Sequence, residues 1–207
     1  MDRSGKIRLL FAGICFVLFA WLMCIMVEKG QENSAVYLES EPVVVQEDEG
    51  KKIMYLTFDD GPSQNTQAVL DILEEYDAKA TFFVTAEFSD YLHLIRAEKE
   101  AGHAIGVHTY SHRYDQIYAD SASYWDDVEK MQKIIEEQCG SRTTILRFPG
   151  GTSNTISQRY AQGIMSQLAE EAEQKQYAYY DWNATNGDGD TSLSAQQLVE
   201  QAKREIG

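Results

Sequence analysis

Cysteine is scarce in this sequence, and its positions limit the chemistry available. Of three cysteines in 207 residues, Cys15 and Cys24 lie in an apolar run near the N-terminus, and Cys139 stands alone in the rest of the chain. A disulfide within the part that follows the apolar run is therefore excluded. A cysteine-rich metal site is excluded there as well, because such a site needs several thiolates.

Positive charge is also in short supply. The chain carries 18 Lys and Arg against 33 Asp and Glu, which gives a net charge of −15. No basic cluster follows the first few residues, and a phosphate backbone would be repelled by such a surface. The composition therefore predicts no nucleic-acid partner. The length allows one medium domain with accessory segments.

The one long apolar run covers residues 9–27, which are 19 consecutive uncharged positions. This is about the length that crosses a bilayer as a helix. Three basic residues in segment 1–8 precede it, so the positive-inside rule predicts a single-pass cell-membrane anchor with a cytoplasmic N-terminus and an extracytoplasmic domain. A cleaved signal peptide is the competing interpretation, although the run is long for one and no A-x-A site follows. Lipid attachment at Cys24 is disfavoured by the bulky residues before it.

Residues 28–50 are predicted to form an acidic linker between the membrane and the domain. Between positions 30 and 50 there are six acidic residues and neither Lys nor Arg, so the segment repels itself and stays solvated. The folded domain is expected over 51–207.

Strand-like and helical patterns alternate through 51–207. Strands are expected over 53–58, 80–86, 104–108, 143–148 and 177–182, and helices near 69–76, 88–101, 122–138, 156–175 and from 194 onward. Strict alternation implies parallel strands with crossover helices, and hence an α/β domain that is either a barrel or an open sheet. In both architectures the functional site lies at the carboxyl ends of the strands.

Side chains with catalytic, metal-binding or substrate-contacting potential lie at or just after the ends of four of these strands. They are Asp59 and Asp60 after the first strand, His108 and His112 after the third, Arg147 in the fourth, and Asp181 and Trp182 in the fifth. The i, i+4 spacing of the two histidines lets both imidazoles reach one ion, and one carboxylate would complete three protein ligands. A histidine pair near a turn also occurs as a simple hydrogen-bonding pair. The acidic pair at a neighbouring strand end favours the metal hypothesis.

The motifs "TFDDGPS", "HTYSH", "RFPGG" and "DWN" resemble, in that order, the first four signature motifs of the polysaccharide deacetylase family. This family is the NodB-homology domain, or carbohydrate esterase family 4. The resemblance implies a deformed (β/α) barrel and metal-dependent removal of acetyl groups from N-acetylated sugars. The leading hypothesis is an extracytoplasmic deacetylase of cell-wall glycan, with N-acetylglucosamine of peptidoglycan or a chitin-like glycan as substrate.

The resemblance also implies a role for each matched residue. Asp60, His108 and His112 would hold a divalent metal, usually Zn²⁺, and Asp59 would be the general base. Arg147 would orient Asp59 and keep it ionised, the Gly150 N–H would stabilise the oxyanion, and Trp182 would form an apolar wall beside the acetyl methyl group.

One family motif is missing from the sequence. The late histidine that acts as general acid has no counterpart, since all four histidines precede position 113, and Asp181, which would orient that histidine, lacks its partner. The barrel is therefore expected to be incomplete at the C-terminus, in a fragment or in a short natural form. Two alternative functions stay open: an O-acetyl xylan esterase, and an inactive module that binds glycan or metal. The oligomeric state is not predicted.

Three further features are interpreted as structural. The segment 186–192, "NGDGDTS", lacks the glycine and the bidentate glutamate of a calcium loop and is expected to be a turn. His103 is expected to make a structural hydrogen bond, and His93 is expected to be exposed on a helix.

Overall fold

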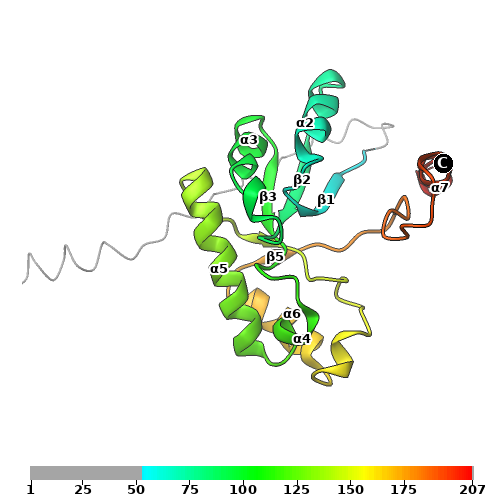
Figure 1. Cartoon of the computed structure of the whole chain (residues 1–207). Coiled ribbons are helices and arrows are strands. Elements are labelled where there is room, and N and C mark those ends of the chain that lie inside the picture. Colours follow the sequence, from blue (N-terminus) through cyan, green and yellow to red (C-terminus); the bar gives the residue numbers. More distant parts are fainter. Residues whose placement is uncertain (1–52, 207) are drawn as a thin grey trace, which may run out of the picture. The chain divides into compact units, whose positions relative to one another are not determined.

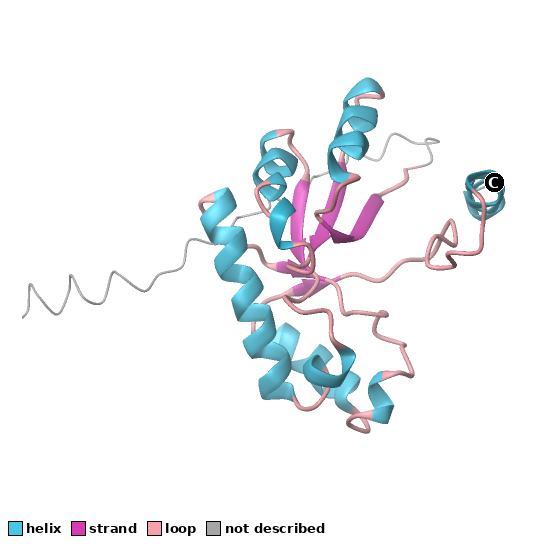
Figure 2. Ribbon diagram, viewed as in Figure 1, coloured by secondary structure: helices cyan, strands magenta, loops and turns pink. Residues whose placement is uncertain are grey.

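A parallel β-sheet forms the centre of the domain in the computed structural model, which describes residues 53–206 (Figures 1 and 2). Its five strands follow the order of the chain: β1 Leu56–Gly61, β2 Ala80–Val84, β3 Ala104–Val107, β4 Ile145–Leu146 and β5 Ala178–Tyr179. Each strand pairs in parallel with the next. The expected α/β class with a parallel sheet is confirmed.

Crossover helices join the strands, as parallel pairing requires. They are α2 Thr66–Glu75, α3 Leu94–Glu100, the short α4 Tyr114–Ile117, α5 Ser121–Cys139 and α6 Ile164–Gln174, with 3-10 turns η1 Ser89–Tyr91 and η2 Ser157–Arg159. The last helix, α7 Ala195–Ile206, follows β5. Helix α2 contacts α3, α3 contacts α5, and α5 contacts α6. These four helices therefore follow one another along the outside of the sheet in chain order (Figure 1).

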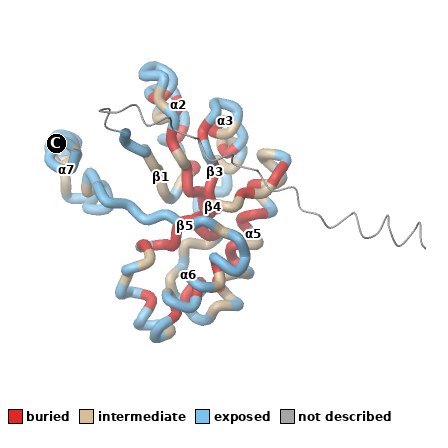
Figure 3. Tube along the Cα trace, turned by 180° about the vertical axis from the view of Figure 1, so that it is seen from behind, coloured by how far each residue is buried: buried red, intermediate tan, exposed pale blue. Residues whose placement is uncertain are grey.

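The hydrophobic core lies between the sheet and this layer of helices (Figure 3). Completely buried members come from both layers, among them Val84, Ile95, Met131, Ile135, Leu146, Phe148 and Leu168. Burying one such side chain stabilises the fold by about 1.5–3 kcal/mol. The strands and α5 thus supply much of the core, whereas no residue of α7 is buried.

The residues at the two ends of helix α5 explain where this helix begins and ends. Asp120 caps its N-terminus by accepting a 2.7 Å hydrogen bond from the Ser123 N–H. Gly140, at φ 77°, ends it in the left-handed conformation that glycine adopts easily. The buried positions of α5 recur every three or four residues: Tyr124, Asp127, Val128, Met131, Gln132 and Ile135. An acid, Asp127, therefore belongs to the buried stripe of this helix.

Several expected boundaries were wrong. The fourth and fifth strands have two residues each. Pro149 and the positive φ angles of Gly150 and Gly151 turn the chain soon after β4. The first strand starts at Leu56 rather than at residue 53. The helix expected over 156–175 begins only at Ile164, after Gly163 with φ 80°, and the one expected over 88–101 divides into η1 and α3.

The predicted cytoplasmic segment 1–8, membrane helix 9–27 and acidic linker 28–50 lie outside the described residues. Within 53–206, no helix combines the length and apolarity that crossing a membrane requires.

Candidate active site

Asp59 and Asp60 reach the same end of the sheet because β1 is irregular there. In a regular strand, consecutive side chains point to opposite faces. The pairing register between β1 and β2 slips between Asp59 and Gly61, and Asp60 has a left-handed φ of 65°. Such a conformation is uncommon for a residue other than glycine, and strained conformations of this kind cluster at functional sites. It allows two adjacent acids to serve one site.

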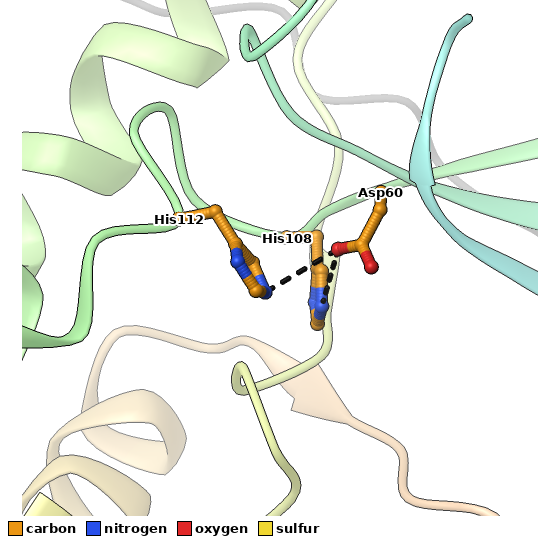
Figure 4. Close-up of side chains that lie close together, drawn as sticks. All are labelled: Asp60, His108 and His112. Atoms are coloured by element: carbon orange, nitrogen blue, oxygen red, sulfur yellow. Dashed lines mark ion pairs between the residues drawn. The ribbon is translucent and has the colours of Figure 1, made fainter. Parts of the chain in front are cut away.

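Asp60, His108 and His112 converge at this end of the sheet (Figure 4). One ligand atom from each residue lies within 4.8 Å of the other two. The Asp60 Oδ1 atom is 3.5 Å from His108 Nε2 and 3.3 Å from His112 Nε2. Donor atoms of one tetrahedral zinc ion, at bonds of about 2.0–2.2 Å, lie roughly 3.4 Å apart. The predicted ligand set is therefore assembled, and its two nitrogens and one oxygen fit a zinc-type cation.

His108 is held in the neutral form that a metal ligand requires. It is buried, and its Nδ1 atom lies 2.8 Å from the Arg147 carbonyl oxygen. Donation of the Nδ1 proton to this carbonyl leaves Nε2 as the acceptor that faces Asp60. Burial lowers the pKa of His108 to about 4, with the charges of His112 and Arg147 acting in the same direction. The imidazole is thus uncharged at neutral pH.

Asp59 lies beside this cluster and is paired with Arg147. Its Oδ1 atom accepts a 2.8 Å hydrogen bond from Arg147 Nη1, and its Oδ2 atom is 3.9 Å from His108 Nε2. Burial raises the pKa of Asp59, and the Arg147 guanidinium opposes this without cancelling it. The expectation that Arg147 pairs with Asp59 is confirmed. The net pKa shift is nevertheless upward, because burial outweighs the ion pair.

Arg147 also connects the first and last strands of the sheet. Its Nη1 atom donates to Thr57 Oγ1 of β1 at 2.8 Å, and its Nε and Nη2 atoms donate to the carbonyl oxygens of Tyr180 and Asp181 just after β5. The guanidinium carbon lies 4.3 Å from the centre of the Phe83 ring. Sequence reasoning missed Thr57. Its spacing of two residues from Asp59 places both side chains on one face of β1 and could have indicated it.

The turn after β4 places Gly150 beside Tyr114, whose ring centre is 5.5 Å from that of His112. A Cβ atom on Gly150 would lie 3.0 Å from the Tyr114 hydroxyl, so the tyrosine occupies the space that a side chain at 150 would fill. The Gly150 N–H donates to none of the described residues. The Trp182 ring lies near the next glycine and 5.5 Å from the Arg147 guanidinium carbon, and it is about half exposed. The two groups predicted to contact the substrate are therefore close to the site: Gly150 lies beside the cluster, and Trp182 lies beside Arg147.

Asp181 is engaged with the turn that follows β4. Its carboxylate accepts hydrogen bonds from the Thr152 N–H at 3.1 and 3.2 Å and from the Thr152 hydroxyl. Its carbonyl accepts from Arg147. Asp181, the residue expected to orient the missing histidine, thus lies next to the site and orients the backbone of this turn.

The residues interpreted as structural have structural surroundings. His103 is buried and its Nδ1 atom accepts from the Ala80 N–H at 3.3 Å, whereas His93 is exposed. Segment 186–192 forms a local turn, in which Asp190 accepts hydrogen bonds from Ser192.

An α/β domain with a His-His-Asp cluster at its strand ends and a partly buried acid beside it has the arrangement of a hydrolytic metal centre. The chain belongs to the polysaccharide deacetylase family: residues 46–167 match the sequence profile described by that name.

Known proteins with similar sequences and structures agree with this assignment. The catalytic domain of peptidoglycan N-acetylglucosamine deacetylase from Eubacterium rectale has 44% identity and a TM-score of 0.75, over 77% of this chain and 73% of that structure. A peptidoglycan-N-acetylglucosamine deacetylase of Bacillus cereus is 29% identical over 64% of this chain and 45% of its own length. A chitin deacetylase of Arthroderma benhamiae is 37% identical over 52% of this chain and 30% of its own length. The chain spans less than half the length of these two curated relatives.

Proposed function

We propose that this chain is a metal-dependent deacetylase that removes N-acetyl groups from a cell-wall polysaccharide. N-acetylglucosamine of peptidoglycan or a chitin-like glycan is the proposed substrate. The observation that carries the proposal is the Asp60, His108 and His112 cluster beside the Asp59–Arg147 pair. Family membership, and the substrates that the names of the relatives state, support it.

The proposed cofactor is one divalent cation, with Zn²⁺ favoured by the two imidazoles. A cation bound by these three residues would lower the pKa of water and polarise an amide carbonyl. Asp59 takes the proton from the attacking water, a task that suits a carboxylate whose pKa is raised by burial. Arg147 fixes the direction of the Asp59 carboxylate through the 2.8 Å hydrogen bond.

The remaining roles concern the acetyl group. The free N–H of Gly150 donates a hydrogen bond to the oxyanion that forms when the carbonyl is attacked. Trp182 offers an exposed apolar surface to the methyl group. Asp181 holds Thr152 and, through its carbonyl, the Arg147 side chain.

The direct test is to measure released acetate and free amines on N-acetylated glycan. Acetylated xylan serves as the comparison substrate, and each reaction is run with and without a chelator. The proposal expects acetate from the N-acetylated glycan, its loss with the chelator, and its return when Zn²⁺ is added. Activity that the chelator leaves unchanged would refute the metal mechanism, and release from xylan alone would favour the O-acetyl esterase.

Two variants separate metal binding from proton transfer. Asp59→Asn is expected to bind Zn²⁺ normally and to lose activity by about 10²–10⁴-fold, because the general base is removed. His108→Ala is expected to lose both Zn²⁺ binding and activity. A wild-type chain that binds zinc and glycan but releases no acetate would instead identify a binding module.

We also propose that residues 9–27 anchor the protein in the cell membrane with the domain outside. Their unbroken apolar character supports this. Membrane fractionation and protease treatment of intact cells test it, since the domain should be membrane-bound and cleavable from outside. Recovery of the whole chain in the soluble fraction would refute the anchor.

A further inference from the structure

The segment between the two histidines of the metal cluster has an unusual backbone. Thr109 has a φ of 76° and His112 a φ of 51°, so two residues other than glycine are left-handed within four positions. Such conformations persist where surrounding contacts impose them. The position of the His112 ring, and thus the third ligand atom, depends on this segment keeping its shape.

Asp127 supplies contacts to this segment from a different part of the fold. It lies in the buried stripe of α5, with 6% of its surface exposed. A single oxygen, Asp127 Oδ1, accepts hydrogen bonds from the Tyr110 N–H at 2.6 Å and from the Ser111 N–H at 3.0 Å. Both donors lie between the two histidines. A buried carboxylate is unfavourable without partners, and these two backbone groups provide them.

The other hydrogen bonds of the segment constrain its backbone less. The Thr109 hydroxyl accepts from the His112 N–H at 3.2 Å, which is a bond internal to the segment. The Tyr110 carbonyl accepts from the Ala86 N–H at 3.0 Å, which ties one residue to the loop after β2. Within residues 53–206, Asp127 is the side chain outside the segment that binds its backbone N–H groups.

We infer that Asp127 is a positioning residue for the metal site. Its carboxylate fixes the backbone of residues 110 and 111, and thereby holds His112 Nε2 at 3.3 Å from Asp60 Oδ1. Asp127 itself is not one of the three clustered ligands. A ligand held in place before the ion arrives does not have to be ordered on binding, so metal affinity rises. This inference rests on the proposed metal-dependent function.

Two substitutions separate the position of the acceptor from its charge. Asp127→Asn keeps an oxygen at the same place and removes the charge. Asp127→Glu keeps the charge and moves the oxygens by one methylene group. If Asp127 acts by position, Asp127→Asn stays within a few-fold of the wild-type metal affinity, whereas Asp127→Glu binds about 10–100-fold more weakly, the usual effect of disturbing an outer contact.

The measurement is metal binding by the full, metal-depleted chain. Co²⁺ is titrated while its visible absorption, which reports ligand geometry, is recorded, and Zn²⁺ is titrated by competition with a coloured chelator. Asp126→Glu is the matched control, because Asp126 is exposed on the same helix and pairs with Lys130. Its affinity and Co²⁺ spectrum should equal those of the wild type.

The inference would be overturned if Asp127→Asn bound metal more weakly than Asp127→Glu. It would also be overturned if Asp127→Glu and the wild type had equal metal affinities and equal Co²⁺ spectra. Either result would leave the proposed function standing. A wild-type chain whose Co²⁺ binding does not depend on His108 and His112 would overturn both. Circular dichroism of each variant confirms that it is folded. Should Asp127→Glu be unfolded, Asp127→Ser takes its place with the same expected loss, because its hydroxyl is too short to reach both donors.

Discussion

Glu98 makes the stability of this domain depend on pH in a way that one substitution can reveal. Its side chain on α3 is completely buried, and neither carboxyl oxygen has a hydrogen-bond partner among the described residues. Burial raises the pKa of Glu98 from 4.5 to about 8. The folded chain therefore keeps a proton that the unfolded chain releases near pH 4.5.

The sign of the effect follows from this difference in bound protons. Below pH 4.5 both states are protonated and Glu98 contributes no pH dependence. As the pH rises from 4.5 to about 8, the unfolded state is increasingly favoured, by about 1.4 kcal/mol per pH unit. The whole interval corresponds to a loss of about 5 kcal/mol, which is comparable to the total stability of many domains.

Glu98→Gln removes this dependence, because glutamine has the shape of the protonated acid and does not ionise. The free energy of unfolding of the variant, relative to the wild type, should increase by about 3 kcal/mol between pH 5.5 and pH 7.5. Urea unfolding followed by circular dichroism at the two pH values measures this change. Any fixed effect of the amide cancels in the comparison.

Glu100→Gln is the matched control, since Glu100 is exposed at the end of the same helix. It should shift stability by less than about 0.5 kcal/mol at either pH. If the difference between Glu98→Gln and wild type is the same at pH 5.5 and 7.5, the carboxyl is already ionised in the folded protein and the reasoning is wrong.

Three further substitutions test the site and the sheet. Arg147→Ala removes the guanidinium that lowers the pKa of Asp59, so the acidic limb of the pH profile of kcat/KM should move to higher pH. Activity should also fall about 10²-fold or more, and an unchanged pH profile would contradict the pairing. Gly150→Ala should reduce activity, because φ is 77° and the new Cβ lies 3.0 Å from the Tyr114 hydroxyl; adding Tyr114→Phe should restore part of it if the clash is the cause. Gly106→Ala places a Cβ 2.5 Å from the buried ring of Phe83 and should destabilise the fold by about 1–3 kcal/mol. Thermal unfolding measures this, and an unchanged melting temperature would show that the ring moves freely.

The metal cluster was predictable because a parallel sheet brings the ends of its strands together. Asp60 lies near the end of β1 and His108 follows β3, so alternation of strands and helices was enough to place them at one edge. The bulge at Asp60 was not foreseen. It depends on the pairing of β1 with β2, and no spacing in the sequence encodes it.

Contacts between distant segments were the part that the sequence could not predict. Asp127 lies on the same helix face as Val128 and Met131, which marks it as buried, but its partners are backbone groups 16 and 17 positions earlier. Backbone N–H groups occur at nearly every residue, so a sequence does not indicate which of them a carboxylate will meet.

The position of Arg147 would make the proposed catalysis a sensitive measure of how well the two edges of the sheet are held together. One guanidinium binds Thr57 and Asp59 of the first strand and two carbonyl groups that follow the last strand. Any drift of these two strands apart must therefore break a hydrogen bond to Arg147 or turn the carboxylate of Asp59. Under mild denaturant or heating, acetate release should fail before secondary structure is lost, so a partly loosened molecule would be inactive although it still looks folded.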